Sequence, residues 1–248
     1  VLGILDTAAE EYTMAKSLRY PRTAYNAVQS TFLAQLGFTG PKTVIEGVEG
    51  FNSTVMGNHL DLDELTQGFR HFHILDTGFK DICAVGAIQG HLQATLNLVR
   101  RYNILPEQID NIKIIAGTRP IEHTGDPAKK FPVNKETADH SSYYLTAIAV
   151  IDRDIGPEQY QQWKYKDPQV ISLINRILLE IDPNMDEKPR SGMSIIQTKD
   201  GQYYENRVDY PLGHPLNPLN DADLERKFKK LSAKHISEKQ IHDILDRI

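Results

Sequence analysis

The sequence predicts a mostly helical chain with an α+β part between two helical stretches. Three patterns support this prediction. Apolar residues recur at helical spacing towards both ends, a β-branched run near the middle alternates as a strand does, and an Asp-Gly turn signal separates two further strand-like runs. Hydrophobic residues make up 40% and charged residues 25% of the 248, which is ordinary for a globular protein and excludes disordered and fibrous classes.

The first predicted helix spans Thr23 to Leu36. Its apolar residues, among them Val28 and Phe32, recur at helical spacing, and a glycine stops the run. An earlier helix capped near Asp6 is expected to run through residue 15, with Pro21 limiting its continuation.

Two more helices are expected before residue 102. The stretch Gly40 to Gly50 has Pro41 in its expected first turn and ends with glycine, so it predicts one short helix. Residues 51–77 read as short strands or loops. A long helix from about Ala84 to Arg101 follows, with His91 near its apolar face.

The predicted α+β part begins with a strand from Ile109 to Ile115, followed by a loop from Gly117 to Pro132. A helix capped at Thr137 or Asp139 should continue through residue 152, and residues 168–179 predict another helix. Residues 195–198 and 203–208 predict a hairpin with Lys199-Asp200-Gly201 at its tip.

The chain should end in two helices, residues 221–231 and 237–248, capped by Asn220 and Ser237. We therefore expect three segments: residues 1–76 as part of a helical domain, residues 77–211 as a smaller α+β domain, and residues 212–248 returning to the helical domain. A cleft between two such lobes is a common place for a small-molecule site.

Composition narrows the function classes. A net charge of −5, with lysine and arginine interspersed among acids, argues against nucleic-acid binding. No apolar run approaches the roughly 18–20 residues that span a bilayer, so no membrane segment is expected.

The single Cys83 excludes an internal disulfide, a cysteine-based zinc site and an iron–sulfur cluster, and favours a reducing compartment. The chain does not begin with Met, so we expect a fragment or a processed chain.

A metal site is an alternative at His71-Phe72-His73, which would place two imidazoles on one side of a strand. No carboxylate or third histidine follows at ligand spacing, so we expect no metal and no cofactor.

Several segments, in the same order, resemble the MmgE/PrpD family, which contains 2-methylcitrate dehydratase and cis-aconitate decarboxylase. Each piece is weak alone, but together they extend over nearly the whole chain. They are Ala15-Lys16-Ser17 with Asn26, Gly37-Phe38-Thr39-Gly40-Pro41, Glu49-Gly50-Phe51, Asn134 to Tyr144, Tyr210 to Pro215, Asn217-Pro218, and Asp223, Leu224, Lys227 and Phe228.

The resemblance implies a large helical domain, a smaller α+β lid domain, a homodimer, and small di- or tricarboxylic acids as substrates. It also implies that the N-terminal part of a full-length member is absent and that a partner chain would have to supply it. A cytoplasmic location is expected, or the mitochondrial matrix in a eukaryote, with a role in propionate metabolism.

The resemblance also supplies candidate site residues. Removing water from a citrate-like acid needs a base, an acid, and cations that hold carboxylates and developing negative charge. Lys16 and Lys80 match the family's cleft lysines as carboxylate ligands, and His91 and Tyr144 are the candidates for proton transfer. His140 is a candidate substrate ligand, although Asp139 and His140 also fit capping and orienting roles. Without the resemblance, Lys16 would be a solvated lysine and His91 a core histidine.

The resulting hypothesis is a metal-independent carbon–oxygen lyase that dehydrates 2-methylcitrate or a related tricarboxylic acid. Decarboxylation of cis-aconitate and epimerisation stay open, because all three reactions pass through a carboxylate-stabilised carbanion or enolate. A different hypothesis is a non-catalytic subunit that needs a partner chain.

Overall fold

The computed structural model describes residues 13–64 and 72–247. They divide into two compact units, one of residues 17–64 with 72–76 and the other of residues 13–16 with 77–247. None of the helices in these described ranges is long and apolar enough to cross a membrane.

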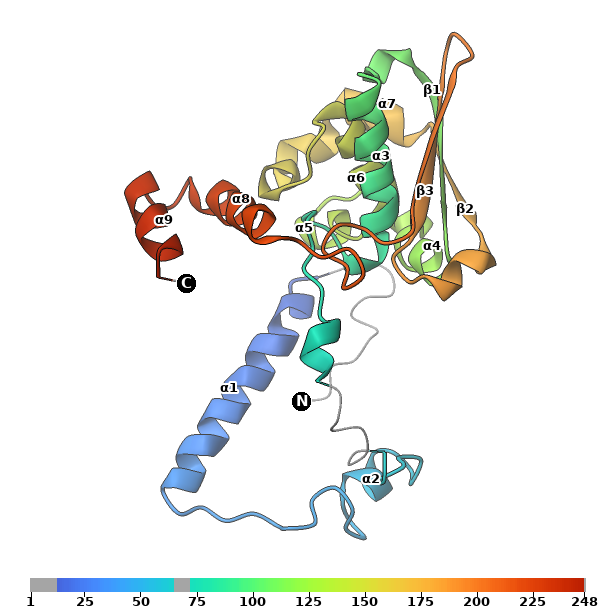
Figure 1. Cartoon of the computed structure of the whole chain (residues 1–248). Helices are drawn as coiled ribbons and strands as arrows, with labels where there is room; N and C mark the ends of the chain where they lie inside the picture. Colours follow the sequence, from blue (N-terminus) through green and yellow to red (C-terminus); the bar gives the residue numbers. More distant parts are fainter. Residues whose placement is uncertain (1–12, 65–71, 248) are drawn as a thin grey trace. The chain divides into compact units, whose positions relative to one another are not determined.

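The second unit is built around a four-stranded mixed sheet in the order β2-β1-β3-β4 (Figure 1). β1 pairs in parallel with β2 and antiparallel with β3, and β3 pairs antiparallel with β4. In this register Ile112 of β1 lies between Ile177 of β2 and Ile196 of β3. The strands are β1 (Ile109–Ala116), β2 (Ile177–Ile181), β3 (Gly192–Thr198) and β4 (Tyr203–Val208).

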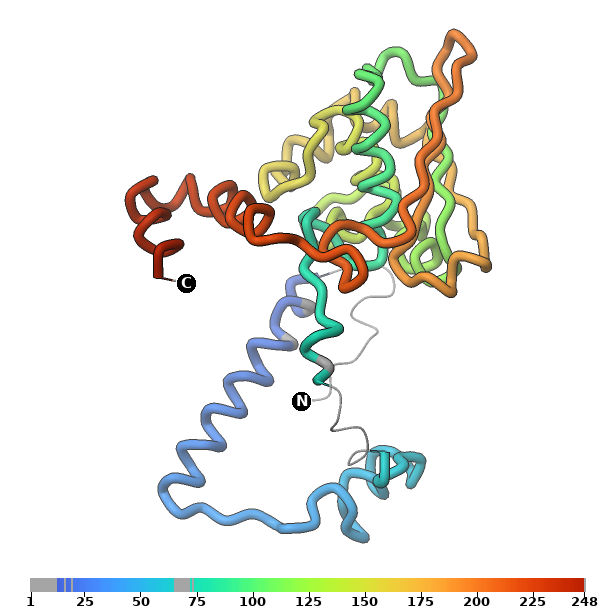
Figure 2. The backbone as a smooth tube through the Cα atoms, in the orientation of Figure 1, coloured from blue at the N-terminus to red at the C-terminus, as the bar shows by residue number. Residues whose placement is uncertain are grey.

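Helices cover one face of this sheet. The helix α3 (Gln89–Arg101) packs on β3 and β4, α6 (Ser142–Ile151) packs on α3, and α7 (Pro168–Ile174) packs on α6. Figure 2 shows α3 running alongside the long hairpin of β3 and β4. The core lies between the layers, with fully buried side chains from α3, β1, α6 and β3, including Leu92, Ile112, Ile114, Leu145, Ile148 and Ile196. The α+β arrangement predicted from the sequence is therefore present in this unit.

Several short elements gather at one edge of the sheet. Because β1 and β2 are parallel, their carboxyl ends meet there, and antiparallel β3 starts at the same edge. The elements at this edge are the 3₁₀ helix η3 (Gly86–Ile88), α4 (Thr118–Thr124) and the 3₁₀ helix η8 (Pro183–Glu187). Further short elements connect the larger ones: η4 (Pro106–Gln108), η5 (Pro127–Lys129), α5 (Lys135–Ala138), η6 (Pro157–Tyr160) and η7 (Gln162–Lys166).

The predicted hairpin and the two C-terminal helices are confirmed. Gly201 at the hairpin tip has a φ of 85°, the left-handed region that glycine enters at little cost. The Asn220 side chain accepts a hydrogen bond from the Asp223 N–H and caps α8 (Asp221–Ser232). The Ser237 hydroxyl accepts one from the Gln240 N–H and caps α9 (Glu238–Leu245).

The first unit contains most of α1 (Ala15–Gln35), together with α2 (Phe51–Thr54) and the 3₁₀ helix η2 (His73–Asp76). The expected stop at Gly37 is confirmed, because Gly37 has a φ of 87° and the Phe38 N–H bonds the Leu33 carbonyl at 3.0 Å. The expected limit at Pro21 is wrong, since α1 runs through it. The earlier helix near Asp6 lies outside the described residues.

Other predicted boundaries need correction. Residues 40–50 form turns, and the helix starts only at Phe51. The predicted helix 168–179 ends at Ile174, and the apolar run Ile177-Leu178-Leu179 becomes β2, because a short apolar run fits either element and pairing with β1 decides. The expected loop after β1 contains α4, and the helix expected from residue 137 or 139 divides into α5 and α6.

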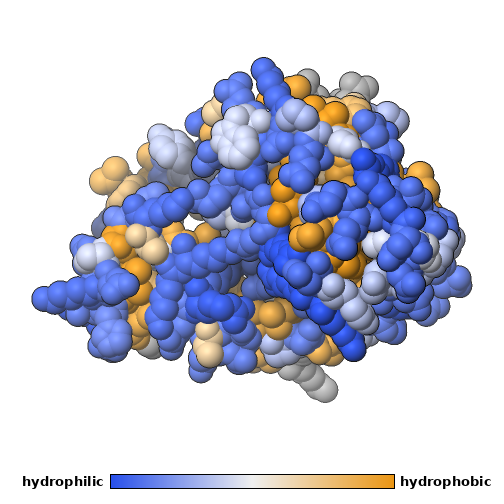
Figure 3. Space-filling view, turned by 90° about the horizontal axis from the view of Figure 1, so that it is seen from above, coloured by the Kyte–Doolittle hydropathy of each residue, from blue (hydrophilic) through white to orange (hydrophobic). Residues whose placement is uncertain are grey.

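Figure 3, seen from above, shows hydrophobic side chains interspersed among hydrophilic ones on that face of the molecule.

Candidate active site

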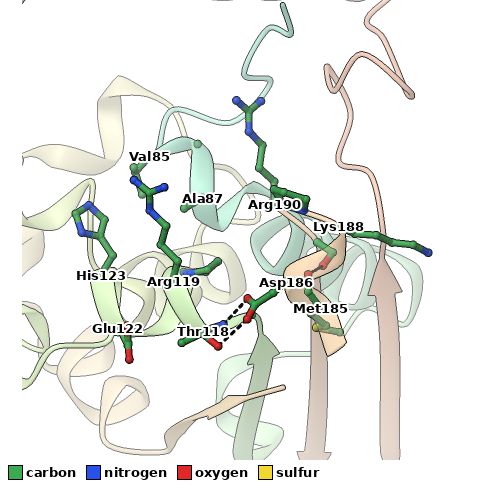
Figure 4. A pocket seen from close by; sticks show the side chains of 15 residues that line it. Val85, Ala87, Thr118, Arg119, Glu122, His123, Met185, Asp186, Lys188 and Arg190 are labelled. Carbon is green, nitrogen blue, oxygen red and sulfur yellow. Dashed lines mark hydrogen bonds between the residues drawn. The ribbon is translucent and has the colours of Figure 1, made fainter. Parts of the chain in front are cut away.

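A cavity of about 530 Å³ opens at the edge of the sheet where β1 and β2 end. Its wall comes from three separate segments, residues 85–87, 117–123 and 185–191. The crevice outside the carboxyl ends of parallel strands is a frequent place for ligands in α/β sheets, because loops from different strands converge there. Figure 4 shows the side chains that line it.

Two of these segments are joined by a clasp between Asp186 and Thr118. The Asp186 carboxylate accepts hydrogen bonds from the Thr118 N–H at 2.8 Å and from the Thr118 hydroxyl at 2.7 Å. Gly117 permits this approach, since a Cβ there would lie 2.3 Å from Asp186 Oδ1. The clasp places a negative charge at the start of α4, where the helix dipole favours it, and uses both carboxylate oxygens.

The wall also carries three cationic side chains among apolar ones. Arg119 of α4 and Arg190, just before β3, extend in the same direction on either side of the cavity, whereas Lys188 points away (Figure 4). The Lys188 ammonium pairs with Asp209 at 2.5 Å. Two acids, Asp186 and Glu122, also lie on the wall. The Asp186 carboxylate is already engaged by hydrogen bonds from Thr118. The two guanidinium groups therefore give the cavity a cationic pair suited to carboxylates.

Arg190 has an unusual backbone conformation. Its φ of 76° is in the left-handed region, which is uncommon outside glycine and marks a locally constrained position. The start of α3 supports it, since a Cβ on Gly90 would lie 2.2 Å from the Arg190 carbonyl oxygen. A Cβ on Gly86 would lie 3.8 Å from Arg190 Nε, so the guanidinium passes over η3.

His123 is the imidazole on the wall of this cavity. Its ring lies 5.8 Å, centroid to centroid, from the ring of His140, with the planes at 76°. His140, a residue predicted from the sequence as a substrate ligand, is buried, does not line the cavity and pairs through Nδ1 with Asp139 Oδ1. This pairing agrees with the orienting role considered for Asp139 and His140, while a direct contact between His140 and substrate stays a prediction.

His91 lies inside the core and not on the cavity wall. It is fully buried, its Nε2 lies 3.3 Å from the Ser142 hydroxyl, and its Nδ1 has no hydrogen-bond partner. Burial lowers the pKa of His91 to about 3, so the ring is neutral near pH 7. The proton-transfer role assigned to it from the sequence stays a prediction.

Tyr144 is also fully buried, and its hydroxyl donates a hydrogen bond to the Gln159 carbonyl. Burial, and to a lesser degree the neighbouring Tyr165 and Asp152, raise the pKa of its phenol well above the usual value. Its ring meets the Tyr165 ring edge to face at 5.4 Å. The surroundings are those of a core residue, and its catalytic role likewise stays a prediction.

Of the two predicted lysines, Lys80 is not among the cavity residues. Lys80 is exposed, and its carbonyl accepts a hydrogen bond from Lys227 Nζ at 2.5 Å. Lys16 lies in the first turn of α1, and its side chain is outside the described part of the structure. Both remain predicted carboxylate ligands.

The residues that do line the cavity, Arg119, His123 and Arg190, were missed in the sequence. The sequence does carry a signal for Arg119 and His123. The segment that begins with Gly117-Thr118-Arg119 directly follows a predicted strand, and polar residues after a strand often belong to a site. Arg190 gave no such signal, because residues 168–179 were predicted as one helix and the strand β2, which precedes the loop of Arg190, was not recognised.

Within residues 13–64 and 72–247, no group of three or more histidine, cysteine, aspartate or glutamate side chains is arranged to hold a metal ion. His71, considered in the sequence as half of a metal pair, lies outside these ranges.

The second unit is thus an α+β body with a cationic cavity at the carboxyl ends of its parallel strands. The model of the MmgE/PrpD C-terminal domain matches residues 83–248, and the chain belongs to the MmgE/PrpD family. Cis-aconitate decarboxylase from Homo sapiens is 28% identical over 92% of this chain and 48% of its own length. The Mus musculus protein of that name is 26% identical over 96% of this chain and 49% of its own length. The chain spans about half the length of these relatives.

Proposed function

We propose that this chain contributes the α+β half of a lyase that acts on small tricarboxylic acids. The observation that carries the proposal is the cavity with Arg119 and Arg190 on opposite sides. Membership of the MmgE/PrpD family and similarity to two cis-aconitate decarboxylases support the reaction class.

The chemistry of these acids explains why two guanidinium groups are useful. Each guanidinium presents parallel N–H donors that match both oxygens of a carboxylate, and it stays charged at every physiological pH. Holding two carboxylates fixes the orientation of the carbon that loses a proton or CO₂. The same positive charges stabilise the carbanion or enolate that develops, and this stabilisation lowers the barrier.

Two specific reactions follow. The names of the relatives favour decarboxylation of cis-aconitate, and dehydration of 2-methylcitrate, a step of propionate metabolism, is the second candidate. Both are proposed to proceed without a metal, and the single cysteine of these 248 residues cannot by itself hold the cluster of iron–sulfur dehydratases. Epimerisation would use the same carbanion.

The active assembly is proposed to include more than these 248 residues. The chain covers about half of each relative, so the rest of the site would come from polypeptide that corresponds to their other half. Lys16 and Lys80 are proposed to add carboxylate ligands in that assembly, a homodimer is proposed, and the cytoplasm or mitochondrial matrix is the proposed compartment. A non-catalytic binding subunit is the alternative.

An assay of the protein in its native assembly tests the proposal. Turnover of cis-aconitate would be followed by CO₂ release, and turnover of 2-methylcitrate by absorbance of the new double bond. Arg119→Gln and Arg190→Gln should lower kcat/KM about tenfold or more, since each removes a charged partner of the substrate and of the developing negative charge. A chelator should leave the rates unchanged.

Arg101→Gln is the matched control, because Arg101 is an exposed arginine at the opposite end of α3 from the cavity. Native mass measurement identifies any second polypeptide in the active fraction. No turnover of any of these acids by an assembly of full composition would reject the lyase proposal and favour the binding subunit.

A further inference from the structure

Three side chains form a connected group behind the cavity wall, and none of the roles above uses them together. His123 lines the cavity, and the His140 ring meets it nearly perpendicular at 5.8 Å. His140 is only 6% exposed, and its Nδ1 pairs with Asp139 Oδ1. A partly exposed acid, a buried imidazole and a cavity imidazole therefore follow one another in contact.

The acid of this group, Asp139, is itself held in place. Asp139 Oδ2 accepts a hydrogen bond from Lys135 Nζ at 2.8 Å. The Asp139 carbonyl accepts one from the Val85 N–H at 3.0 Å, and Val85 belongs to the cavity wall. Burial alone would lower the pKa of Lys135, but its hydrogen bond to Asp139 and the charge of Asp139 raise it. Asp139 is thus held at both its side chain and its backbone.

His123 is also held from behind. Lys129, only 1% exposed, donates a hydrogen bond from Nζ to the His123 carbonyl at 2.5 Å. Burial lowers the pKa of Lys129, while the nearby Asp126 opposes the shift. The buried lysine therefore anchors the backbone at the end of α4, and His140 restricts the ring.

We propose that His123 is the proton-transfer residue of the cavity and that the Asp139–His140 pair is its positioning device. The inference rests on the proposed lyase function and assigns it a residue that the sequence did not indicate. A carboxylate that fixes the orientation of one imidazole, which in turn fixes another group, is a common arrangement in acid–base sites.

The proton balance of the reaction is as follows. In decarboxylation the C–C bond to one carboxylate breaks, CO₂ leaves, and the electron pair shifts through the allylic system to a carbon that takes one proton from the His123 imidazolium. The imidazole then recovers a proton from water through the open cavity. In dehydration the neutral His123 imidazole takes the proton beside a carboxylate, and the resulting imidazolium passes that proton to the departing hydroxyl group, which leaves as water.

A double-mutant cycle on the native assembly separates positioning from general structural support. His123→Ala should lower kcat about 10² to 10⁴-fold with little change in KM, and added imidazole should restore part of the rate. Asp139→Asn and His140→Gln should each lower kcat about tenfold or more. In the His123→Ala background, the same two changes should cost almost nothing, since no imidazole is left to position.

His235→Gln is the control, because His235 is exposed and lies in the loop between α8 and α9. His123→Gln, with circular dichroism, guards against a folding defect of the alanine variant. Equal losses from Asp139→Asn with and without His123 would overturn the positioning role. Full activity of His123→Ala beside an active wild type would overturn the inference alone, whereas an inactive wild type would overturn the lyase proposal and this inference with it.

Discussion

Residues 77–247 bury apolar side chains of their own, whereas residues 17–54 expose most of theirs. In the sheet unit, Leu92, Ile112 and Ile148 are fully buried between strands and helices. On α1, Val28 is 57% and Phe32 60% exposed, and Leu36, directly after the helix, is 84% exposed. Burial of apolar surface is the main source of stability, so the sheet unit has a stabilising core and α1 lacks one. We therefore expect the exposed apolar side chains of α1 to pack against polypeptide outside their own unit.

Hydrogen exchange of the whole chain should show the largest difference between the two regions. Amides of β1 and β3 should exchange only through global opening, which costs about 5–15 kcal/mol in ordinary domains. Amides of α1 should exchange through local opening, many orders of magnitude faster. Mass spectrometry of peptides from exchanged protein measures both. Equal protection of α1 and β1 would show that α1 has found a packing partner in solution.

Acid should weaken the sheet unit through His91. Its pKa is about 3 in the folded chain and 6.5 in the reference state, so between these values the unfolded chain binds a proton that the folded chain does not. The contribution is complete above pH 6.5 and is lost as the pH falls towards 3, by about 1.4 kcal/mol per pH unit. Urea unfolding from pH 7 to 4 measures it.

His91→Gln should flatten that pH dependence, and His235→Gln controls for the loss of a histidine. An unchanged slope in the His91 variant would mean that water reaches His91 in the folded protein.

Truncation of core and helix side chains sharpens the comparison further. Ile112→Ala should lower the free energy of unfolding by about 2–5 kcal/mol, because it opens a cavity in a filled core. Phe32→Ala on α1 should change it by less than about 0.5 kcal/mol, since the ring is 60% exposed. Denaturant unfolding by circular dichroism compares them. A large loss of unfolding free energy from Phe32→Ala would show that the Phe32 side chain of α1 is packed in a core.

The smallest expected effect concerns the cavity wall. Asp186→Ala removes two hydrogen bonds to Thr118 and should lower the free energy of unfolding by about 1–2 kcal/mol. Because Asp186 is exposed, this is less than the loss for a buried core residue. Thr118→Val, which keeps the N–H partner, should cost less than Asp186→Ala. A larger loss of stability from Thr118→Val than from Asp186→Ala would show that the Thr118 hydroxyl, and not its N–H at the start of α4, holds the clasp.

Local signals made parts of the fold predictable from the sequence. The Asp-Gly turn located the β3–β4 hairpin, and Asn220 and Ser237 located α8 and α9, because each of these residues acts on its own neighbours. β2 was missed because its apolar run suits a helix equally well, and only pairing with a strand more than sixty residues earlier decides. Pairing between strands that are far apart in the chain gives no signal within a short stretch of sequence.

The candidate site was less predictable for the same reason. Family resemblance directed attention to His91 and Tyr144, which the structure places in the core. Arg119, His123 and Arg190 come from segments about seventy residues apart and meet only because β1 and β2 end at one edge. The order of strands in a sheet cannot be read from the spacing of residues along the chain.

The parallel pairing of β1 with β2 has a consequence for how such a site diversifies. The strands fix where the cavity lies, but its charged side chains belong to two short segments, residues 118–123 and 186–190, that follow β1 and β2. Segments that connect strands tolerate substitution better than the strands themselves, so a relative could exchange these two segments and accept a different acid while keeping the same sheet. Selectivity and stability would then evolve on separate parts of the same polypeptide.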